Sequence, residues 1–133
     1  MKEFSLDIIT PDGLLFSGEA LSVVARTTVG DVCILASHSD YVGNIDFGSV
    51  KIKTAEFEKY ASCIGGFLSV NGGKVKIVAT TFEFAEDIDV ERAEGARAKA
   101  ERALSSSTDE HQLKIAELKL KRALNRLSVS KKA

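Results

Sequence analysis

Apolar and polar residues alternate along the first two thirds of the chain. Val50 and Ile52 are each followed by a lysine, and Val75 and Ile77 are each preceded by one. An alternation with a period of two places one set of side chains in a core and the other in water, which is typical of β-strands. Turn signals follow at short intervals, at 11–13, 30–31, 43–44, 48–49 and 71–73. The pattern over residues 1–84 therefore predicts an antiparallel β-sandwich or flattened barrel.

Beyond residue 85 the apolar spacing changes from two to about 3.6, the period of an amphipathic helix. Two stripes follow one another: Ala93, Ala96, Ala100 and Ala103, then Leu113, Ala116, Leu120, Ala123 and Leu127. We expect Asp87 to cap the first helix, and Ser107 with Glu110 to form a capping box at the second. Two helices joined by so few residues run antiparallel, so 85–133 is predicted to be a two-helix hairpin. Alanines bury little area, which makes this hairpin weakly held.

Charge divides the chain at the same place. Residues 1–86 carry seven Lys or Arg against eleven Asp or Glu, and residues 87–133 carry eleven against eight. The mildly acidic and mildly basic parts indicate two units with different partners. Neither part has the basic, aromatic-rich surface of a nucleic-acid-binding protein. The longest uncharged stretch, 60–73, is too short and polar to span a bilayer, and the first residues lack a signal region, so we expect a cytoplasmic protein.

The residues that usually carry chemistry form no catalytic or metal-binding set. His38 and His111 are far apart, and neither has a cysteine or carboxylate at metal-ligand spacing. The sequence also lacks the glycine-rich P-loop that holds phosphates for hydrolysis. Cys33 and Cys63 lie in apolar stretches, so we expect both to be buried as small hydrophobic residues. We therefore expect no enzyme activity, no metal and no required cofactor.

Three strings of residues occur in this order along the chain: Asp7 to Gly13, Gly65-Gly66-Phe67, and Glu86 to Leu104. Together with a sandwich followed by a hairpin, they resemble the epsilon-subunit family of bacterial F-type ATP synthases over nearly the whole chain. The resemblance implies a non-catalytic rotor subunit of the proton-translocating enzyme. It also implies a peripheral position on the cytoplasmic face of the bacterial plasma membrane, with membrane association only through the complex.

The resemblance assigns different partners to the two parts. It implies that the sandwich, 1–84, docks on the gamma subunit and the c-ring. The hairpin, 85–133, would regulate ATP hydrolysis: compact against the sandwich it permits hydrolysis, and extended it reaches the alpha/beta catalytic ring and obstructs it. The basic second helix suits acidic partner surfaces.

The docking loop of the family is only partly present. Gly30, Ile34, Leu35 and His38 match the family pattern, whereas its second and third glycines, both prolines and the final leucine are replaced. The residues that the resemblance implies for partner contact are Ile34, Leu35, His38 and Tyr41. The loss of the prolines predicts a less rigid loop, because proline restricts the unfolded chain.

A last set of residues points to a nucleotide. Ile88, Asp89, Arg92 and Ala93 match the family's ATP-binding motif, Ile/Leu-Asp-x-x-Arg-Ala, and Arg122 and Arg126 share one face of the second helix. If the hairpin turns near residue 106, the three arginines converge at its open end, where guanidinium groups suit phosphate oxygens. The resemblance implies ATP as a regulatory ligand. It also implies that the side of the motif that holds the aspartate contacts the adenine. It adds two contacts, Glu83 and Lys99, the latter standing where an arginine is common.

Two alternatives remain open at this point. Charge alone also fits ordinary surface salt bridges, joining Arg122 or Arg126 to Glu91 or Glu94. A function of another class fits as well: a free-standing nucleotide-sensing or adaptor protein whose hairpin closes over its ligand. Co-purification with the gamma subunit would separate this function from that of a rotor subunit.

Overall fold

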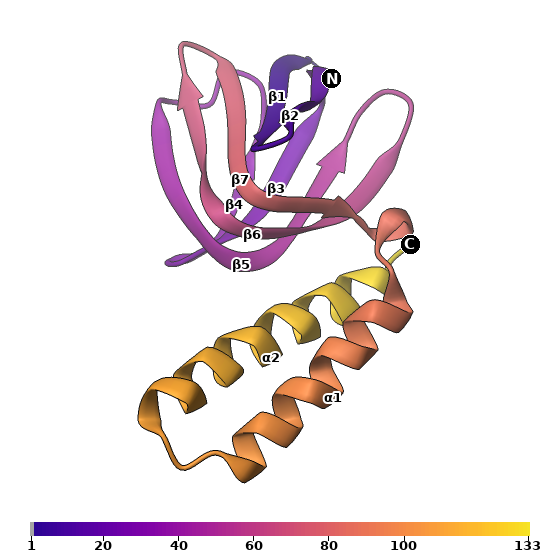
Figure 1. Ribbon diagram of the computed structural model, residues 1–133. Helices are drawn as coiled ribbons and strands as arrows, with labels where there is room; N and C mark the ends of the chain where they lie inside the picture. The colour runs from indigo at the N-terminus through magenta and orange to yellow at the C-terminus, as the bar shows by residue number, and fades with distance from the viewer. Residues whose placement is uncertain (1) are drawn as a thin grey trace.

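Seven strands make up the N-terminal part of the computed structural model, which describes residues 2–133 (Figure 1). They are β1 (Phe4–Thr10), β2 (Gly13–Ala20), β3 (Ser22–Thr27), β4 (Gly30–Ile34), β5 (Tyr41–Lys53), β6 (Glu58–Asn71) and β7 (Lys74–Phe84). The strands form one sheet in the order β2-β1-β7-β6-β5-β3-β4. The long strands β5, β6 and β7 bend sharply along their length (Figure 1), so the sheet folds over itself into two layers. The expected β-sandwich followed by a two-helix hairpin is confirmed.

One strand pair departs from the predicted antiparallel pattern. β1 and β7 run parallel, with Leu6 opposite Val75 and Ile8 opposite Ile77. The other neighbouring strands in the sheet are antiparallel. The β1–β2 hairpin joins the sheet as a unit with β1 on its inner side, so the first strand lies beside the last.

The core follows the period-two pattern. The predicted apolar positions of β5 and β7 are buried, and the lysines between them reach the surface. Side chains with no exposed surface include Leu6, Ile8, Val23, Val50, Ile52, Leu68 and Ile77. Cys63 is buried as expected, whereas the prediction for Cys33 is wrong, because that side chain is exposed. Cys33 lies on the edge strand β4 between Val32 and Ile34, and those two neighbours take the inward positions.

Two of the predicted turns are also wrong, because Gly43-Asn44 and Gly48-Ser49 lie inside β5. The glycines serve close packing instead. A side chain at position 43 would overlap the Tyr41 ring, and one at position 48 would press on Arg26 of β3. Glycine within a strand often marks such an approach, so a glycine alone does not distinguish a turn from a crowded strand.

The C-terminal part is a hairpin of α1 (Val90–Ser106) and α2 (Glu110–Ser130), reached from β7 through a short 3-10 turn, η1 (Ala85–Asp87). α1 packs on α2, and α2 packs on β5, β6 and η1. Small side chains line the contact between the helices, among them Ala93, Ala100, Ala116 and Ala123, all buried. The sandwich therefore meets the hairpin mainly through α2.

Both predicted helix caps are displaced. Asp89, not Asp87, caps α1 by accepting a hydrogen bond from the Arg92 amide at 3.0 Å. Asp109 caps α2 by accepting from the amide of the second helical residue at 3.1 Å. Ser107 therefore opens no capping box and instead follows the end of α1. An aspartate carries full charge at the positive end of a helix, which favours it over a serine two residues earlier.

Candidate functional site

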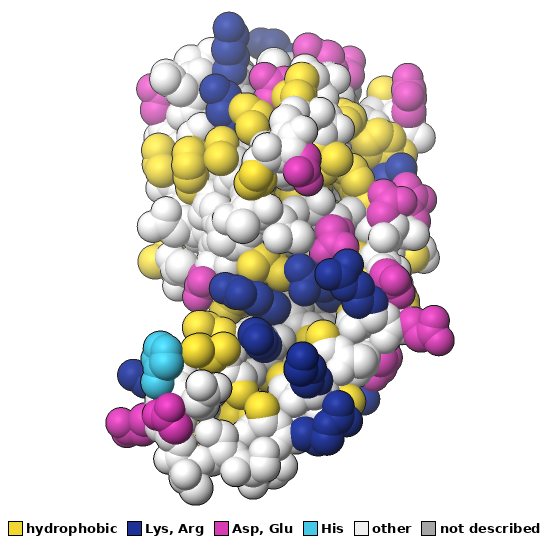
Figure 2. All heavy atoms as spheres, in the orientation of Figure 1, with side chains coloured by type: hydrophobic (Ala, Val, Ile, Leu, Met, Phe, Trp, Pro, Cys, Tyr) yellow, Lys and Arg dark blue, Asp and Glu magenta, His cyan; other side chains and the backbone are white. Residues whose placement is uncertain are grey.

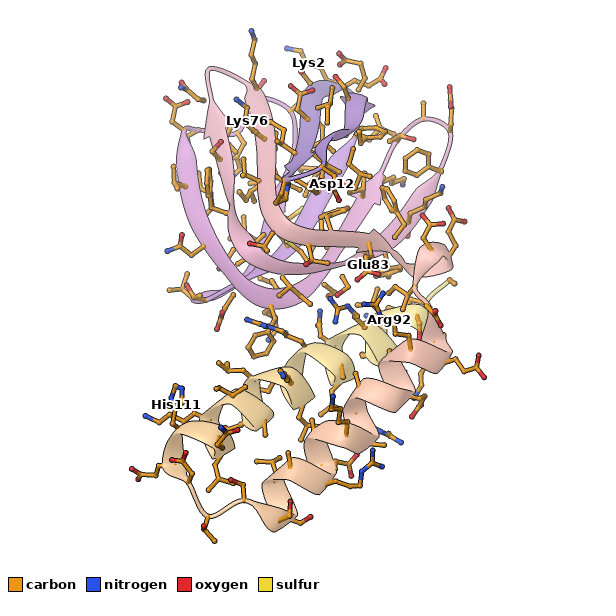
Figure 3. The ribbon with its side chains drawn as sticks, viewed as in Figure 1. Lys2, Asp12, Lys76, Glu83, Arg92 and His111 are labelled. Carbon is orange, nitrogen blue, oxygen red and sulfur yellow. The ribbon has the colours of Figure 1, made fainter. Side chains whose placement is uncertain are left out.

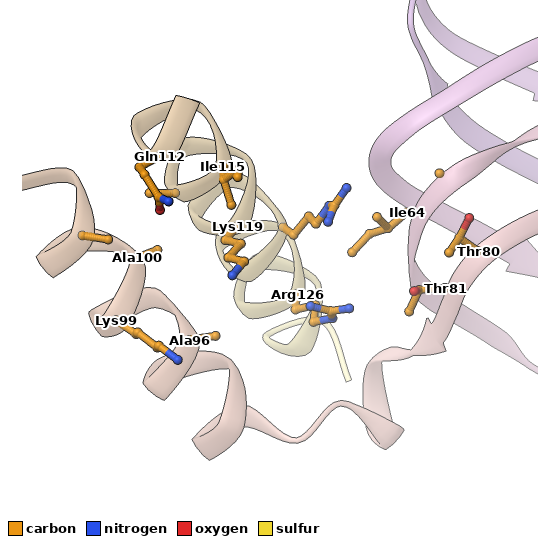
Figure 4. Close-up of a pocket in the computed structure, with 14 residues that line it drawn as sticks. Ile64, Thr80, Thr81, Ala96, Lys99, Ala100, Gln112, Ile115, Lys119 and Arg126 are labelled. Carbon is orange, nitrogen blue, oxygen red and sulfur yellow. The ribbon is translucent and has the colours of Figure 1, made fainter. Parts of the chain in front are cut away.

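A cavity of about 610 Å³ lies between α1, α2 and the bend of β6 and β7 (Figure 4). Its volume falls in the range typical of small-molecule sites. One wall is apolar, with alanines from α1 and Ile115 and Ala116 from α2. The strands contribute the hydroxyl residues Thr80 and Thr81. The cavity thus offers a ligand both apolar surface and hydrogen-bonding groups.

Four cationic side chains line the same cavity. Lys119, Arg122 and Arg126 come from α2, and Lys99 comes from α1. The three α2 residues are spaced by three and four, so they lie on one face of the helix. Figure 2 shows Lys and Arg side chains gathered where the hairpin meets the sandwich and along the hairpin. This concentration of positive charge favours an anionic ligand.

One carboxylate balances part of this charge. Arg126 donates a hydrogen bond from Nε to Glu83 Oε1 at 2.7 Å, and both side chains are about 30% exposed, at 29% and 32%. The bond uses one of the five N–H donors of a guanidinium group. The terminal nitrogens of Arg126 keep donors for another acceptor while the ion pair links α2 to β7.

A second polar link lies beside that ion pair. The Asn125 side-chain amide donates to the carbonyl of Gly48 at 3.1 Å and to Ser62 Oγ at 2.9 Å. Ser62 is completely buried, so its hydroxyl depends on a protein partner. We call Asn125, Gly48 and Ser62 the Asn125 clasp. It ties the C-terminal half of α2 to β5 and β6.

A small apolar cluster completes the contact between the two parts. Val129 near the end of α2 packs with Ala85 and Ile88, and Tyr60 of β6 covers the group. The Lys132 ammonium lies 4.8 Å from the centre of the Tyr60 ring. The docking surface under α2 is therefore a few polar links around one small cluster.

The structure separates the predicted nucleotide residues into two groups. Lys99, Arg122 and Arg126 line the cavity, and Glu83 is bonded to Arg126. Ile88 belongs to the apolar cluster and Ala93 to the buried face between the helices.

The motif residues Asp89 and Arg92 also lie outside the cavity wall. Asp89 caps α1, and Arg92 is exposed in its first turn. Figure 3 shows Glu83 at the sandwich edge and Arg92 at the start of α1, on the two sides of the junction. The alternative salt bridges of Arg122 or Arg126 with Glu91 or Glu94 are replaced by other pairs. Arg126 pairs with Glu83, and Glu94 pairs with Arg97 at 2.9 Å.

Sequence reasoning missed Lys119, Thr80 and Thr81 as cavity residues. For Lys119 a signal existed, because it precedes Arg122 by three positions and therefore shares its helix face. The two threonines carried no local signal. They reach the cavity only because β7 bends beneath the hairpin.

The expected partner-contact residues differ in exposure. Leu35 is exposed, His38 and Tyr41 are half-buried, and Ile34 is enclosed in the core. The His38 and Tyr41 rings meet edge to face with centres 6.1 Å apart. Leu35 is one of several large apolar side chains exposed on the sandwich: Leu14, Leu15, Val29, Leu35, Val42 and Phe67. These six side chains are the large apolar groups that the described part of the sandwich presents to solvent.

Residues 2–133 show neither a metal-binding cluster nor a helix suited to crossing a membrane. Within that range, no group of three or more His, Cys, Asp or Glu side chains is arranged to hold a metal ion. Neither described helix combines the length and apolar character that crossing a membrane requires.

Comparison with known proteins gives consistent matches along the chain. The family described as ATP synthase, Delta/Epsilon chain, beta-sandwich domain matches residues 3–85, and the long alpha-helix domain of the same chain matches 86–131. An ATP synthase epsilon chain from Ruminococcus albus is 36% identical over 133 residues, covering 99% of each chain. One from Bacillus velezensis is 38% identical over 130 residues, covering 98% of each.

Solved structures agree with this result. A chain of the Euglena gracilis mitochondrial ATP synthase, in a structure of OSCP, F1 and c-ring, superposes with a TM-score of 0.81 at 25% identity. The match covers 92% of this chain and 78% of that one. A chain of the Tetrahymena thermophila mitochondrial ATP synthase central stalk and c-ring gives 0.63 at 11% identity, with 97% of each chain covered. The second match supports the fold alone.

Proposed function

The chain belongs to the ATP synthase delta/epsilon chain family, and from that premise we propose that its hairpin is an ATP-sensitive regulator of hydrolysis. The chain is a non-catalytic subunit of the central stalk of ATP synthase. The observation that carries the proposal is the cavity of about 610 Å³ in which four cations face an alanine wall.

ATP suits this cavity on chemical grounds. Its purine is flat and largely apolar, which fits the wall of alanines and Ile115. Its phosphates are anionic, and the planar donor forks of Arg122 and Arg126 suit phosphate oxygens. Because residues from both helices and both bent strands line the cavity, a ligand there would contact every element that closes around it.

Such a ligand would favour the compact arrangement of the molecule. A ligand that binds one conformation stabilises it by RT ln(1 + [L]/Kd), about 2.7 kcal/mol at a hundredfold excess over Kd. That is comparable with the net worth of the few hydrogen bonds that dock α2. Ample ATP would hold the hairpin against the sandwich and permit hydrolysis. Falling ATP would release the hairpin to extend toward the alpha/beta catalytic ring and obstruct it.

The sandwich would supply the attachment to the rotor. Its exposed apolar residues, with Val42 at 71% exposure, support docking on the gamma subunit and the c-ring. The subunit would then be peripheral at the cytoplasmic face of the bacterial plasma membrane, held there through the complex.

Val42→Glu should abolish co-purification with gamma, while Val90→Glu, a matched change at an exposed valine of α1, should leave it intact. Equal retention of gamma by both variants would contradict this docking surface.

Calorimetry and thermal melting of the whole chain with ATP test the regulatory proposal. Arg126→Ala should weaken ATP binding by about 1.5–3 kcal/mol, the range for hydrogen bonds to charged groups. Because that change also breaks the ion pair, Glu83→Gln serves as a control that breaks the pair and keeps the arginine. Arg92→Ala asks whether the motif arginine outside the cavity wall turns toward bound ATP. Absence of both heat and a melting shift at millimolar ATP would refute nucleotide sensing.

A further inference from the structure

The last residues of α2 return to the point where the hairpin starts. Val129 is 1% exposed and packs with Ala85 and Ile88, which lie on the path from β7 into α1. The Lys132 ammonium lies 4.8 Å from the centre of the Tyr60 ring of β6. Figure 1 shows the C-terminus beside η1. The end of the chain therefore covers the segment from which the hairpin leaves the sandwich.

The 3-10 turn η1 is also attached to the sandwich by contacts that do not involve α2. It directly follows Phe84, which pairs with Ala61 of β6. The Glu86 carboxylate accepts a hydrogen bond from Lys59 Nζ at 2.6 Å. The same ammonium lies 4.9 Å from the centre of the Phe57 ring and 5.4 Å from that of Phe84, so cation–π contacts add to the ion pair. These attachments to β6 do not depend on the position of the hairpin.

One residue joins η1 to α1 without a short backbone hydrogen bond. Ile88 has extended backbone angles, φ −72° and ψ 125°, and its amide lies 3.4 Å from the Ala85 carbonyl, longer than an ordinary hydrogen bond. Asp89 already belongs to α1, because its side chain caps the helix and its carbonyl accepts from the Ala93 amide at 3.0 Å. Hinges are commonly residues at the end of an element whose backbone angles can change. Ile88 fits that description.

We propose that the hairpin pivots at Ile88 and that Val129 and Lys132 form a latch that holds it closed. This rests on the proposed function, in which the hairpin leaves the sandwich, and adds where the chain bends and what holds it without a ligand. The two family domains meet between residues 85 and 86, whereas the moving body begins at Asp89 and η1 stays with the sandwich. The latch residues lie outside the cavity wall, so the latch acts with or without a nucleotide.

Single-molecule energy transfer on the whole chain measures the ratio of open to compact molecules. Cys33 is an exposed thiol on the sandwich, and Thr108→Cys adds a second one in the loop between the helices, so two dyes report the position of the hairpin. Val129→Ala should raise the ratio about tenfold, because it removes two buried methyl groups from the cluster. Lys132→Gln should raise it about threefold through loss of the cation–π contact.

Three control variants locate the pivot. Val90→Ala makes the same change at an exposed valine of α1, and Lys131→Gln removes the neighbouring exposed charge, so neither should change the ratio. Glu86→Gln weakens the attachment of η1 to β6 and should also leave the ratio unchanged, because that attachment is present in both conformations. An increase with Glu86→Gln equal to that with Val129→Ala would overturn the pivot at Ile88, since η1 would then leave with the hairpin.

The outcomes separate the latch from nucleotide sensing. If millimolar ATP lowers the open fraction of the wild type while Val129→Ala behaves as Val90→Ala, the latch is overturned and nucleotide sensing stands. If Val129→Ala opens the hairpin and ATP has no effect on any variant, the latch stands and nucleotide sensing fails. If neither the wild type nor any variant populates a second position of the hairpin, with or without ATP, both proposals fail.

Discussion

The interior of the sandwich and the surface beneath the hairpin are held together by opposite kinds of contact. Inside the sandwich, aliphatic side chains from all layers of the sheet are fully enclosed. Beneath the hairpin, α2 docks through the Asn125 clasp, the pair of Arg126 with Glu83, and a small cluster around Val129. One region buries many large apolar groups, and the other makes a few hydrogen bonds that water can replace.

The difference predicts that unfolding the sandwich costs much more free energy than detaching the hairpin from it. Burial of each large aliphatic side chain contributes about 1.5–3 kcal/mol, so opening the sandwich costs its whole stability. A hydrogen bond exchanged with water contributes about 0.5–1.5 kcal/mol net, so the hairpin can leave the sandwich at low cost. Such a division would let the hairpin move without unfolding the sandwich.

The largest expected difference between sandwich unfolding and hairpin detachment can be measured at the cysteines. Burial raises the pKa of the Cys63 thiol to about 12, from an ordinary 9.0, whereas Cys33 is exposed. At pH 8 a thiol reagent should label Cys63 at least about a thousandfold more slowly than Cys33, because labelling requires global unfolding at about 5 kcal/mol or more. Asn125→Ala should not change the rate at Cys63. A parallel acceleration there would show that hairpin and sandwich open together.

The same pKa sets a pH dependence with a definite sign. The folded-state value lies above the ordinary value, so the neutral thiol contributes its stability in full below pH 9. That contribution is lost as the pH rises from 9 toward 12.

The second test removes one core side chain. Leu68 has no exposed surface, so Leu68→Ala should lower the free energy of unfolding by about 3 kcal/mol, the sum of lost burial and a cavity. Urea denaturation measures the change. Leu118→Ala on the hairpin, where the side chain is 44% exposed, is the control and should shift stability by less than about 0.5 kcal/mol. Similar losses in both variants would remove the distinction between the regions.

The third test breaks the docking surface alone. Asn125→Leu leaves the buried Ser62 hydroxyl without its partner, which should cost about 1–3 kcal/mol of hairpin docking. Faster hydrogen exchange in the second half of α2, with unchanged exchange in β6, would report it. A double-mutant cycle with Ser62→Ala isolates the pair. Leu124→Ala, an exposed neighbour on the same helix, should leave exchange unchanged, and an equal effect there would argue against the clasp.

The smallest effect concerns the loop between β4 and β5. Ser37 has a φ of +66°, a conformation that costs little for glycine and more for other residues. Ser37→Gly should raise the free energy of unfolding by about 0.5 kcal/mol, since the relief of strain exceeds the added entropy of the unfolded chain. Thermal melting measures the shift. Ser39→Gly supplies the control, and a gain at position 39 rather than 37 would contradict this account.

The fold was predictable from the sequence because each part has one dominant period. Alternation in β5 and β7 matches the observed burial, whereas in the alanine stripe of α1 only Ala93 and Ala100 are buried and Ala96 is exposed to the cavity. Local signals were less dependable where tertiary packing competes with them. Gly43 and Gly48 have the residue type of turns, yet both lie inside β5, where a side chain at 43 would overlap the Tyr41 ring and one at 48 would press on Arg26.

The part of the candidate site that helix geometry alone could predict is the part that lies on one helix face. Arg122 and Arg126 could be placed on one face by their spacing, and they line the cavity. The motif residues Ile88, Asp89 and Ala93 have structural roles here, as cluster, cap and helix contact. No sequence pattern reveals that β7 bends under the hairpin and brings its threonines to the cavity wall.

The parallel pairing of β1 with β7 also determines when this protein can fold during its synthesis. Roughly 60 residues separate the two strands, so closing the sheet needs a long loop and is slower than forming a local helical hairpin. A chain made from its N-terminus exposes the inner edge of β1 until β7 has been added. When β7 is complete, residues 85–133 are still to be made. The sandwich can therefore close before the hairpin has fully left the ribosome.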